Sequence, residues 1–300
     1  MTPGRWFTSG LLCALLYRAV SLEPAVGQRS PVKGNAVKSM IQLEFADGST
    51  LANARSPHYP GNQFRFWLLE AVCTWDHGPL GDNKELYANA RWSRDGSSVR
   101  QTSQVPRLYS YTLFIKPAID KMDLQIQLTN ESPNSWENTV LPACFQLNES
   151  PSFCDWEGER TFVVVDGRYR AITQTNRVEP VRWQNYLLTE RELPLQNGLV
   201  YGHQPLSPQR VSNGLIGVLS KDGRSVAGVI WNCVGYVFYN QHPDFCCIHS
   251  QPLLGHMKPG QTKRVKGTFY LLDGGMKELE AKAREDYGER LGNCMPQDVQ

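Results

Sequence analysis

Two-residue turn signals recur along this chain and constrain its fold more than any other feature. Asn-Gly and Asp-Gly steps supply the positive φ angles that tight β-hairpins require. They occur at Asp47-Gly48, Asp95-Gly96, Asp166-Gly167, Asn197-Gly198, Asn213-Gly214, Asp222-Gly223 and Asp273-Gly274. Turns spaced in this way predict a succession of short antiparallel strands.

The segments between the turns alternate apolar and polar residues with a period of two. In Met122–Thr129 the apolar residues at 124, 126 and 128 would point to one face and the polar residues between them to the other. That pattern is typical of a half-buried antiparallel strand. Further strands are predicted at 107–115, 161–165, 214–219, 226–231, 234–239 and 264–272. The fold class predicted is therefore all-β.

One segment near the end of the chain is typical of a helix. In residues 275–291, Met276, Leu279, Ala283 and Tyr287 recur at helical spacing among strong helix formers. Residues 64–74 fit either a strand or a buried helix. No Pro/Gly/Ser-rich hinge divides residues 39–290. We predict one large antiparallel two-sheet sandwich over residues 39–292, closed by a C-terminal helix and followed by a loose tail at 293–300.

The N-terminal residues 1–27 have the pattern of an export signal. Arg5 precedes the short apolar segment 6–17, and Ala25-Val26-Gly27 offers the small residues that a signal peptidase reads. Cleavage there would leave a polar linker at 28–38; the alternative is an N-terminal extension without this role. We predict a secreted protein, or a periplasmic or cell-envelope one. The sequence has no apolar run of about 18 residues, so it predicts no transmembrane span.

Export of the protein would determine the expected redox state of its cysteines. Loss of Cys13 would leave seven of the eight cysteines, and an odd number in an oxidising compartment implies at least one free or intermolecular thiol. Cys144 and Cys154 are separated by a turn-rich segment and are candidates for a disulfide. Adjacent Cys246 and Cys247 on a strand would point to opposite faces. The chain has no CxxC pair, which argues against a zinc ribbon or a thioredoxin-like motif.

Residues 231–260 hold the densest group of reactive side chains, namely His242, Asp244, Cys246, Cys247, His249 and His256. Cys247 and His249 would share one face of a strand, with His242 arriving from the preceding turn. Such donors suit zinc, but their spacing matches no standard zinc pattern, and we assign no metal and no cofactor. The group either braces the loop or forms an acid–base site with His249 and His242 as catalytic candidates.

A second candidate site is Trp75-Asp76-His77, with Glu70 upstream. A histidine beside a carboxylate can act in general acid–base catalysis, so Asp76 and His77 join the catalytic candidates. The alternative is that both side chains only cap turns.

Two tryptophan-bearing loops form a third candidate site. An indole ring beside amides and carboxylates suits a sugar, because the ring stacks on the apolar sugar face and the planar polar groups take its hydroxyls. The alternative is that the aromatic side chains of a large sandwich belong to its core. The ligand-binding candidates are Trp136, Asn138, Asp155, Trp156 and Asn240.

Two stretches resemble the large antiparallel supersandwich of galactose-mutarotase-like domains. One is LQIQLTN at 124–130, followed by the turn that bears Trp136; the other is MKPGQT at 257–262, which leads into RVKGTFYLL at 264–272. The segment Cys247–Pro252 with that PGQT turn also resembles uncharacterised exported proteins of environmental bacteria. The resemblance implies a supersandwich fold and contact with sugars. Mutarotases would need two histidines and a glutamate; His249 could be one of them, and the glutamate is unassigned.

Three functions remain open at this point. The first is an exported β-sandwich that binds carbohydrate. The second is a carbohydrate-active enzyme, an isomerase or lyase that uses histidine and carboxylate chemistry. The third is a structural envelope protein without a small ligand.

A net charge of +2 gives no electrostatic basis for binding nucleic acid, and the GxSxG, HExxH, P-loop and GxGxxG motifs are all missing. The oligomeric state is open.

Overall fold

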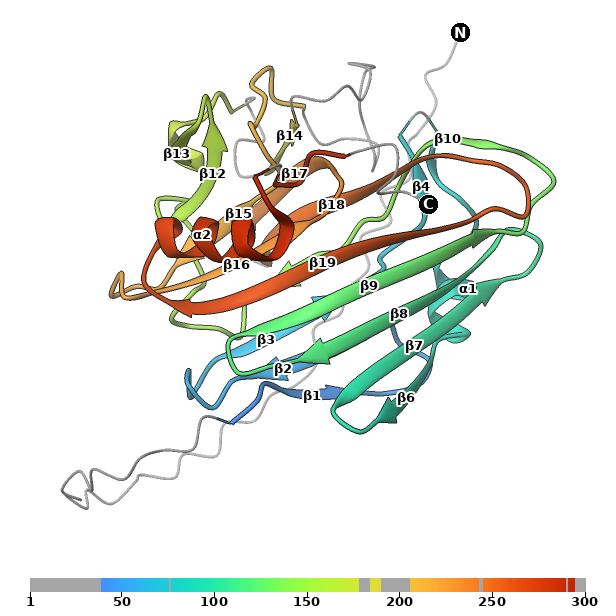
Figure 1. The fold of residues 1–300 in the computed structure, drawn as a ribbon, viewed down its shortest axis with the longest axis horizontal. Helices are drawn as coiled ribbons and strands as arrows, with labels where there is room; N and C mark the ends of the chain where they lie inside the picture. The colour runs from blue at the N-terminus through green and yellow to red at the C-terminus, as the bar shows by residue number, and fades with distance from the viewer. Residues whose placement is uncertain are drawn as a thin grey trace, which may run out of the picture. The chain divides into compact units, whose positions relative to one another are not determined.

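The computed structural model of the chain describes residues 39–75, 77–177, 184–189, 206–242, 245–289 and 291–294. Two antiparallel β-sheets build this part of the chain, and a C-terminal helix lies against one of them (Figure 1). The prediction of an all-β, two-sheet sandwich is confirmed. The predicted export signal and linker lie outside the described residues. None of the helices in the described ranges is long and apolar enough to cross a membrane.

The first sheet has ten strands and carries the pocket described below. Its main path runs β1-β2-β3-β11-β18-β10-β4-β5, and β17 joins the other side of β18 and pairs with β14 in turn. The strands are β1 (Gln42–Phe45), β2 (Leu51–Arg55), β3 (Gln63–Trp67), β4 (Cys73–Thr74), β5 (Gly78–Pro79), β10 (Trp136–Val140), β11 (Cys144–Gln146), β14 (Gln184–Leu188), β17 (Val234–His242) and β18 (Phe245–Met257).

The second sheet has nine strands in the order β13-β12-β15-β16-β19-β9-β8-β7-β6. They are β6 (Arg91–Asp95), β7 (Ser98–Val105), β8 (Tyr109–Pro117), β9 (Lys121–Asn130), β12 (Thr161–Val165), β13 (Arg168–Ala171), β15 (Ile216–Leu219), β16 (Ser225–Trp231) and β19 (Thr262–Asp273). A 3-10 turn, η1 (Ile172–Gln174), follows β13. Strand β9 alternates buried and half-buried residues along its whole length, as its sequence predicts.

Aromatic rings fill the space between the two sheets. Phe269 of β19 stacks parallel to Phe145 of β11, with ring centroids 5.5 Å apart, and meets Phe66 and Phe64 of β3 at 4.9 and 5.6 Å. All four side chains are buried. This contact joins the second sheet to the strands β3 and β11, whose opposite face carries the pocket.

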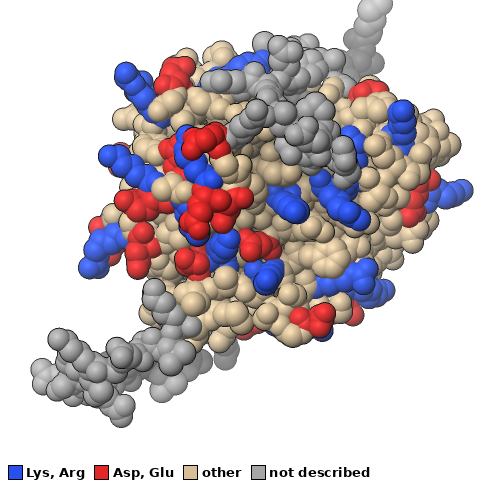
Figure 2. Space-filling view, in the orientation of Figure 1, with Lys and Arg blue, Asp and Glu red and all other residues tan. Residues whose placement is uncertain are grey.

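The C-terminal helix α2 (Met276–Tyr287) packs on the outer face of the second sheet (Figure 1). Leu279 reaches the sheet where β15 and β16 have Gly217 and Gly228; a Cβ atom there would come within 2.6 and 2.4 Å of its Cδ2 atom. The glycines therefore allow the close approach of helix and sheet. The outer side of α2 is polar, and acidic and basic side chains mix over this face of the molecule (Figure 2).

A second, short helix was not predicted. Helix α1 (Asn83–Ala88) begins after Asp82, whose side chain accepts a hydrogen bond from the Lys84 main-chain N–H at 2.8 Å. An acidic residue that caps the first turn is a common start signal. The ambiguous segment 64–74 resolves into most of β3, a connecting loop and the whole of β4.

The disulfide differs from the predicted one. Cys233 bonds Cys294, 61 residues further along the chain, and ties the C-terminal segment to the start of β17. The proposed partners Cys144 and Cys154 are both free thiols. Cys144 lines the pocket, whereas Cys154 belongs to the core between the sheets, where its thiol hydrogen-bonds that of Cys246. The two side chains lie on opposite faces of the first sheet and cannot pair.

Candidate functional site

One face of the first sheet brings together side chains from four neighbouring strands. In the pairing of β17 with β18, Asn240 lies opposite Cys247 and Phe238 lies opposite His249. On the other side of β18, Gln146 of β11 lies opposite Cys247. Because residues two apart on a strand share a face, the alternate residues of each strand line a common surface.

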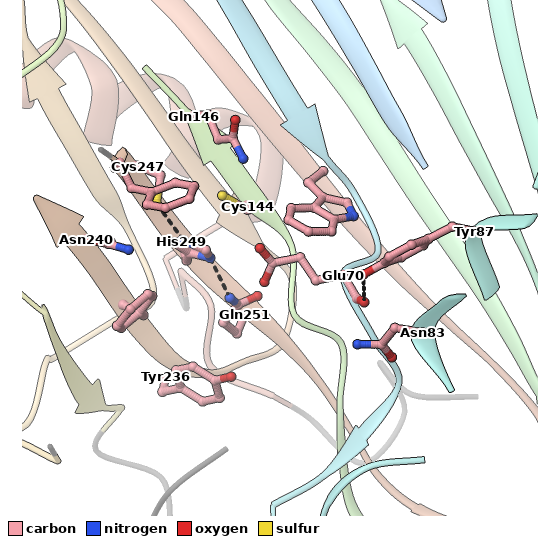
Figure 3. A pocket seen from close by; sticks show the side chains of 13 residues that line it. Glu70, Asn83, Tyr87, Cys144, Gln146, Tyr236, Asn240, Cys247, His249 and Gln251 are labelled. Atoms are coloured by element: carbon pink, nitrogen blue, oxygen red, sulfur yellow. Dashed lines mark hydrogen bonds between the residues drawn. The ribbon is translucent and has the colours of Figure 1, made fainter. Parts of the chain in front are cut away.

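This surface forms a pocket of about 260 Å³. Figure 3 shows its side chains converging from the strands and from α1. Five Trp, Tyr and Phe rings, four primary amides, two thiols, one carboxyl group and one imidazole make the wall. The lining residues are Trp67, Glu70, Asn83, Tyr87, Cys144, Gln146, Tyr236, Phe238, Asn240, Phe245, Cys247, His249 and Gln251.

The opposite face of the same strands belongs to the core. Cys246 and Ile248 of β18, Phe145 of β11 and Tyr239 of β17 alternate with the pocket residues and are buried between the sheets. The prediction that Cys246 and Cys247 point to opposite faces, and that Cys247 and His249 share one, is confirmed.

Helix α1 and the loop after β3 complete the wall of the pocket. The Tyr87 hydroxyl donates a hydrogen bond to the Glu70 main-chain oxygen at 2.7 Å, and the Tyr87 ring lies 5.6 Å from that of Trp67. Asn83, the first residue of α1, has its Oδ1 atom buried without a hydrogen-bond partner. A buried acceptor without a donor costs about 1–3 kcal/mol. Because Asn83 also lines the pocket, its side-chain amide is a candidate contact for a ligand.

A chain of polar contacts crosses the floor of the pocket. His249 Nε2 lies 3.1 Å from Cys247 Sγ, and His249 Nδ1 lies 2.9 Å from the Gln251 side-chain nitrogen. Gln251 is itself held in place, because its side-chain oxygen accepts the Ala143 main-chain N–H at 2.6 Å. The Phe238 ring meets the imidazole edge-on at 4.8 Å. These contacts fix the orientation of the imidazole ring, with Nε2 toward the thiols (Figure 3).

The two thiols at the floor differ in acidity. The hydrogen bond from the Cys144 thiol lowers the pKa of Cys247 to about 5 in spite of its burial, and His249 and the Asn240 main-chain N–H act in the same direction. Burial raises the pKa of the Cys144 thiol well above its usual value, and its hydrogen bond to Cys247 adds to this. Of the pair, Cys247 is therefore the more acidic thiol.

Two titratable neighbours of these thiols, His249 and Glu70, also have shifted pKa values. Burial lowers the pKa of His249, but attraction to the Cys247 thiolate more than offsets this and the pKa lies above its usual value. Burial raises the pKa of Glu70 to about 7, although the positive charge of His249 opposes the shift. A carboxyl group and an imidazole that face one pocket can exchange protons with a bound ligand near neutral pH. Chemically, the site can also hold a soft metal ion, since the Cys144 and Cys247 sulfurs and a His249 nitrogen all lie within 4.8 Å of one another.

Of the four predicted catalytic residues, the pocket contains His249. His77 is exposed in the turn between β4 and β5 and does not line the pocket. Asp76, Asp244 and the His242 side chain lie outside the described part of the structure. Exposed His256, grouped with them in the sequence, pairs with Glu137 at 2.5 Å.

Of the five predicted ligand-binding residues, the pocket contains Asn240. Trp136 is 5% exposed and packs edge-on against Tyr109 in the core, so it presents no face to a ligand. Asp155 is also buried, and its carboxylate accepts hydrogen bonds from the Arg160 main-chain N–H and the Thr161 hydroxyl at 2.9 and 2.8 Å. These positions brace the fold.

The remaining two ligand-binding candidates lie apart from the pocket lining. Asn138 has a positive φ of 46° in β10, and its carbonyl accepts the Trp75 main-chain N–H at 3.0 Å. It shapes an irregular strand, where asparagine tolerates this conformation. Trp156 is 42% exposed on the surface.

Several pocket residues were not identified from the sequence. Cys144 is only a disulfide candidate in the sequence, and Trp67 lies in the ambiguous segment 64–74. Glu70 was noted only as a neighbour of His77. The available signal was the spacing of two in Cys144 and Gln146 and in Cys247, His249 and Gln251, but it becomes a site only when β11 pairs with β18.

Comparison with known proteins gives similarity in structure alone. The chain matches no protein family model and no curated protein. A galactose mutarotase-like protein from Lactobacillus casei is 11% identical, with 78% of this chain and 100% of that one covered and a TM-score of 0.42. A galactose 1-epimerase from Lactobacillus acidophilus is 9% identical, with 79% and 98% covered and a TM-score of 0.42. A putative aldose 1-epimerase from Escherichia coli is 12% identical, with 74% and 76% covered and a TM-score of 0.40. At these identities and scores, the chemistry of this chain rests on its own residues.

Proposed function

We propose that this protein binds a carbohydrate, and that the pocket of the first sheet is its binding site. The observation that carries the proposal is the combination of aromatic walls, side-chain amides and the unpaired Asn83 oxygen in one pocket. A sugar ring has apolar faces that stack on aromatic rings and hydroxyls that hydrogen-bond planar amides.

The size of the pocket limits the ligand. A volume of about 260 Å³ lies below the roughly 300–1,000 Å³ of sites for drug-sized molecules. It therefore suits a single sugar ring better than a chain of several. Exposed Phe245 stands at the rim, where it can cover one face of that ring.

The first test is a thermal-shift screen of the protein against monosaccharides and oligosaccharides, followed by calorimetric titration of each sugar that raises the melting temperature. A ligand that binds only the folded state stabilises it by about 2.7 kcal/mol at a hundredfold excess over its dissociation constant. We expect shifts from monosaccharides. If no saccharide shifts the transition, the proposal fails and the structural envelope role gains support.

The Asn83→Ala variant connects binding to the pocket. It removes the unpaired oxygen at the first position of α1, where alanine is a good helix former, so the fold should keep its stability. Loss of one hydrogen bond should weaken saccharide binding about 3–10-fold. Trp156→Ala is the control, since it removes an exposed aromatic ring outside the pocket. Equal affinity of Asn83→Ala and wild type would place the ligand elsewhere.

The same titrations address the enzymatic alternative. Each bound sugar is followed by NMR for exchange between its anomers with and without protein. Catalysed exchange that is lost in Glu70→Gln while binding remains would identify an isomerase. Binding without exchange leaves a binding protein.

A further inference from the structure

We propose that Cys144, Cys247 and His249 form a binding site for a zinc-type divalent cation, with one coordination position open to the pocket. The donor atoms all lie within 4.8 Å of one another, and Cys247 Sγ is 3.1 Å from His249 Nε2. Zinc holds sulfur at about 2.3 Å and nitrogen at about 2.0 Å, so the donors around a tetrahedral ion lie about 3.5–3.8 Å apart. The donor atoms in the protein are 3.1 Å to at most 4.8 Å apart, a range that includes that distance.

Strand pairing explains why the two thiols converge without forming a disulfide. Cys247 lies opposite Gln146, two residues from Cys144, so the cysteines occupy diagonal positions on neighbouring antiparallel strands. Diagonal positions are about 7–8 Å apart, whereas disulfides usually need about 4.4–6.8 Å between Cα atoms. The chain does close a disulfide where the geometry allows it, at Cys233 and Cys294. The diagonal thiols are suited to share an ion.

The imidazole is oriented as a metal ligand requires. A histidine that binds a metal through one ring nitrogen donates the N–H of its other ring nitrogen to an acceptor such as a main-chain carbonyl. The Gln251 side-chain nitrogen, 2.9 Å from Nδ1, is a donor and so is not that acceptor; its amide is held in place because its oxygen accepts the Ala143 main-chain N–H at 2.6 Å. The ring also hydrogen-bonds the main chain of Ala143, whose carbonyl can accept a ring proton when Nε2 binds an ion. The ring is thus fixed with Nε2 toward the thiols.

The fourth coordination position faces the pocket. Glu70 hydrogen-bonds the Cys144 thiol and lines the same cavity, so its carboxylate borders that position (Figure 3). Three protein donors with one open position are typical of zinc sites that bind a water molecule or a ligand, whereas structural zinc sites use four. An ion here could contact an oxygen atom of a bound molecule. The inference does not depend on the identity of that molecule.

Cobalt(II) and zinc, each added alone to the metal-free, full-length protein under reducing conditions, test the site. We expect one cobalt ion per chain, with the intense visible absorption of a tetrahedral ion and the near-ultraviolet band of thiolate coordination. Zinc should displace the cobalt and remove both bands. Cys144→Ser, Cys247→Ser and His249→Ala should each weaken zinc binding at least about 10-fold.

The matched control is Cys246→Ser, since this cysteine neighbours Cys247 on β18 but faces the core. It should retain cobalt binding. X-ray absorption of the zinc-loaded wild type serves if a variant fails to fold, and should show two sulfur ligands and one imidazole. No stoichiometric cobalt or zinc binding by wild type, an all-nitrogen/oxygen coordination shell, or equal loss in Cys246→Ser would overturn the proposal. Saccharide titration of the metal-free protein is independent of these results, so this site and the carbohydrate proposal can fail separately.

Discussion

Phe269→Ala should be among the most damaging single substitutions in the core, because this ring joins the two sheets. Its side chain is fully buried and contacts three other phenylalanine rings, at 4.9 to 5.6 Å between centroids. Replacing a buried phenylalanine by alanine costs about 3–5 kcal/mol. Each aromatic pair adds about 0.5–1.5 kcal/mol beyond area burial, so we expect the upper half of that range, about 4–5 kcal/mol.

That loss is a large part of the roughly 5–15 kcal/mol that stabilises a typical domain. For a chain of this size, about 1 kcal/mol shifts the melting temperature by about 2–4 °C, so the variant should melt about 8–20 °C below wild type. Urea denaturation followed by circular dichroism measures the free energy of unfolding directly. Because Phe145 stacks on Phe269 from the strand that carries Cys144, the variant should also bind pocket ligands more weakly.

Phe114→Ala is the matched control, the same substitution at a ring that is 40% exposed on β8. The guanidinium of Arg100 lies over this ring, 5.7 Å from its centroid, an interaction worth about 0.5–1 kcal/mol at an exposed site. We expect a loss of about 1 kcal/mol or less. If both variants lost the same free energy, or if Phe269→Ala lost less than about 1.5 kcal/mol, the inter-sheet aromatic contact would not have the role assigned to it.

Three further substitutions test separate features by the same denaturation assay. Cys233→Ser opens a disulfide that spans 61 residues and should lower the free energy of unfolding by about 4 kcal/mol. A reducing agent should bring wild type to the stability of the variant, and a stability difference that persists would contradict the disulfide. Gly267→Ala would place a Cβ about 2.5 Å from the Trp231 ring and should cost about 1–3 kcal/mol through overpacking, so an unchanged melting temperature would show that the ring has room to move. Asp155→Ala removes the acceptor of the buried Thr161 hydroxyl and of the partly buried Arg160 main-chain N–H, and should cost about 1–3 kcal/mol. Trp156→Ala should stay within about 0.5 kcal/mol of wild type and keep the saccharide affinity; the reverse order would return residues 155–156 to the ligand-binding candidates.

The experiments on the pocket complement these stability tests. Loss of saccharide binding in Asn83→Ala concerns the wall of the pocket, whereas loss of cobalt binding in Cys247→Ser concerns its floor. The two results together would show whether a bound sugar lies over an ion or over the free thiols.

The sequence by itself determined the elements whose signals are local. The alternation in Met122–Thr129 predicts β9, and the spacing of Met276, Leu279 and Ala283 predicts α2, because each pattern depends on the geometry of one element alone. The recurring Asp-Gly and Asn-Gly turns predict antiparallel strands for the same reason. Alternation also predicted correctly that Cys246 and Cys247 face opposite sides of their strand.

Only the tertiary structure decided which side chains meet. A strand's sequence shows that it has two faces, but not which strand pairs with it or which face another sheet covers. Trp136 and Trp156 each lie beside a glutamate in the sequence, yet the first packs against Tyr109 in the core and the second is 42% exposed. Cys144 joins Cys247 and His249, and not Cys154, because β11 pairs with β18 in one register. Strand pairing is a long-range choice that depends on the packing of the whole sandwich, and the candidate site is a consequence of that choice.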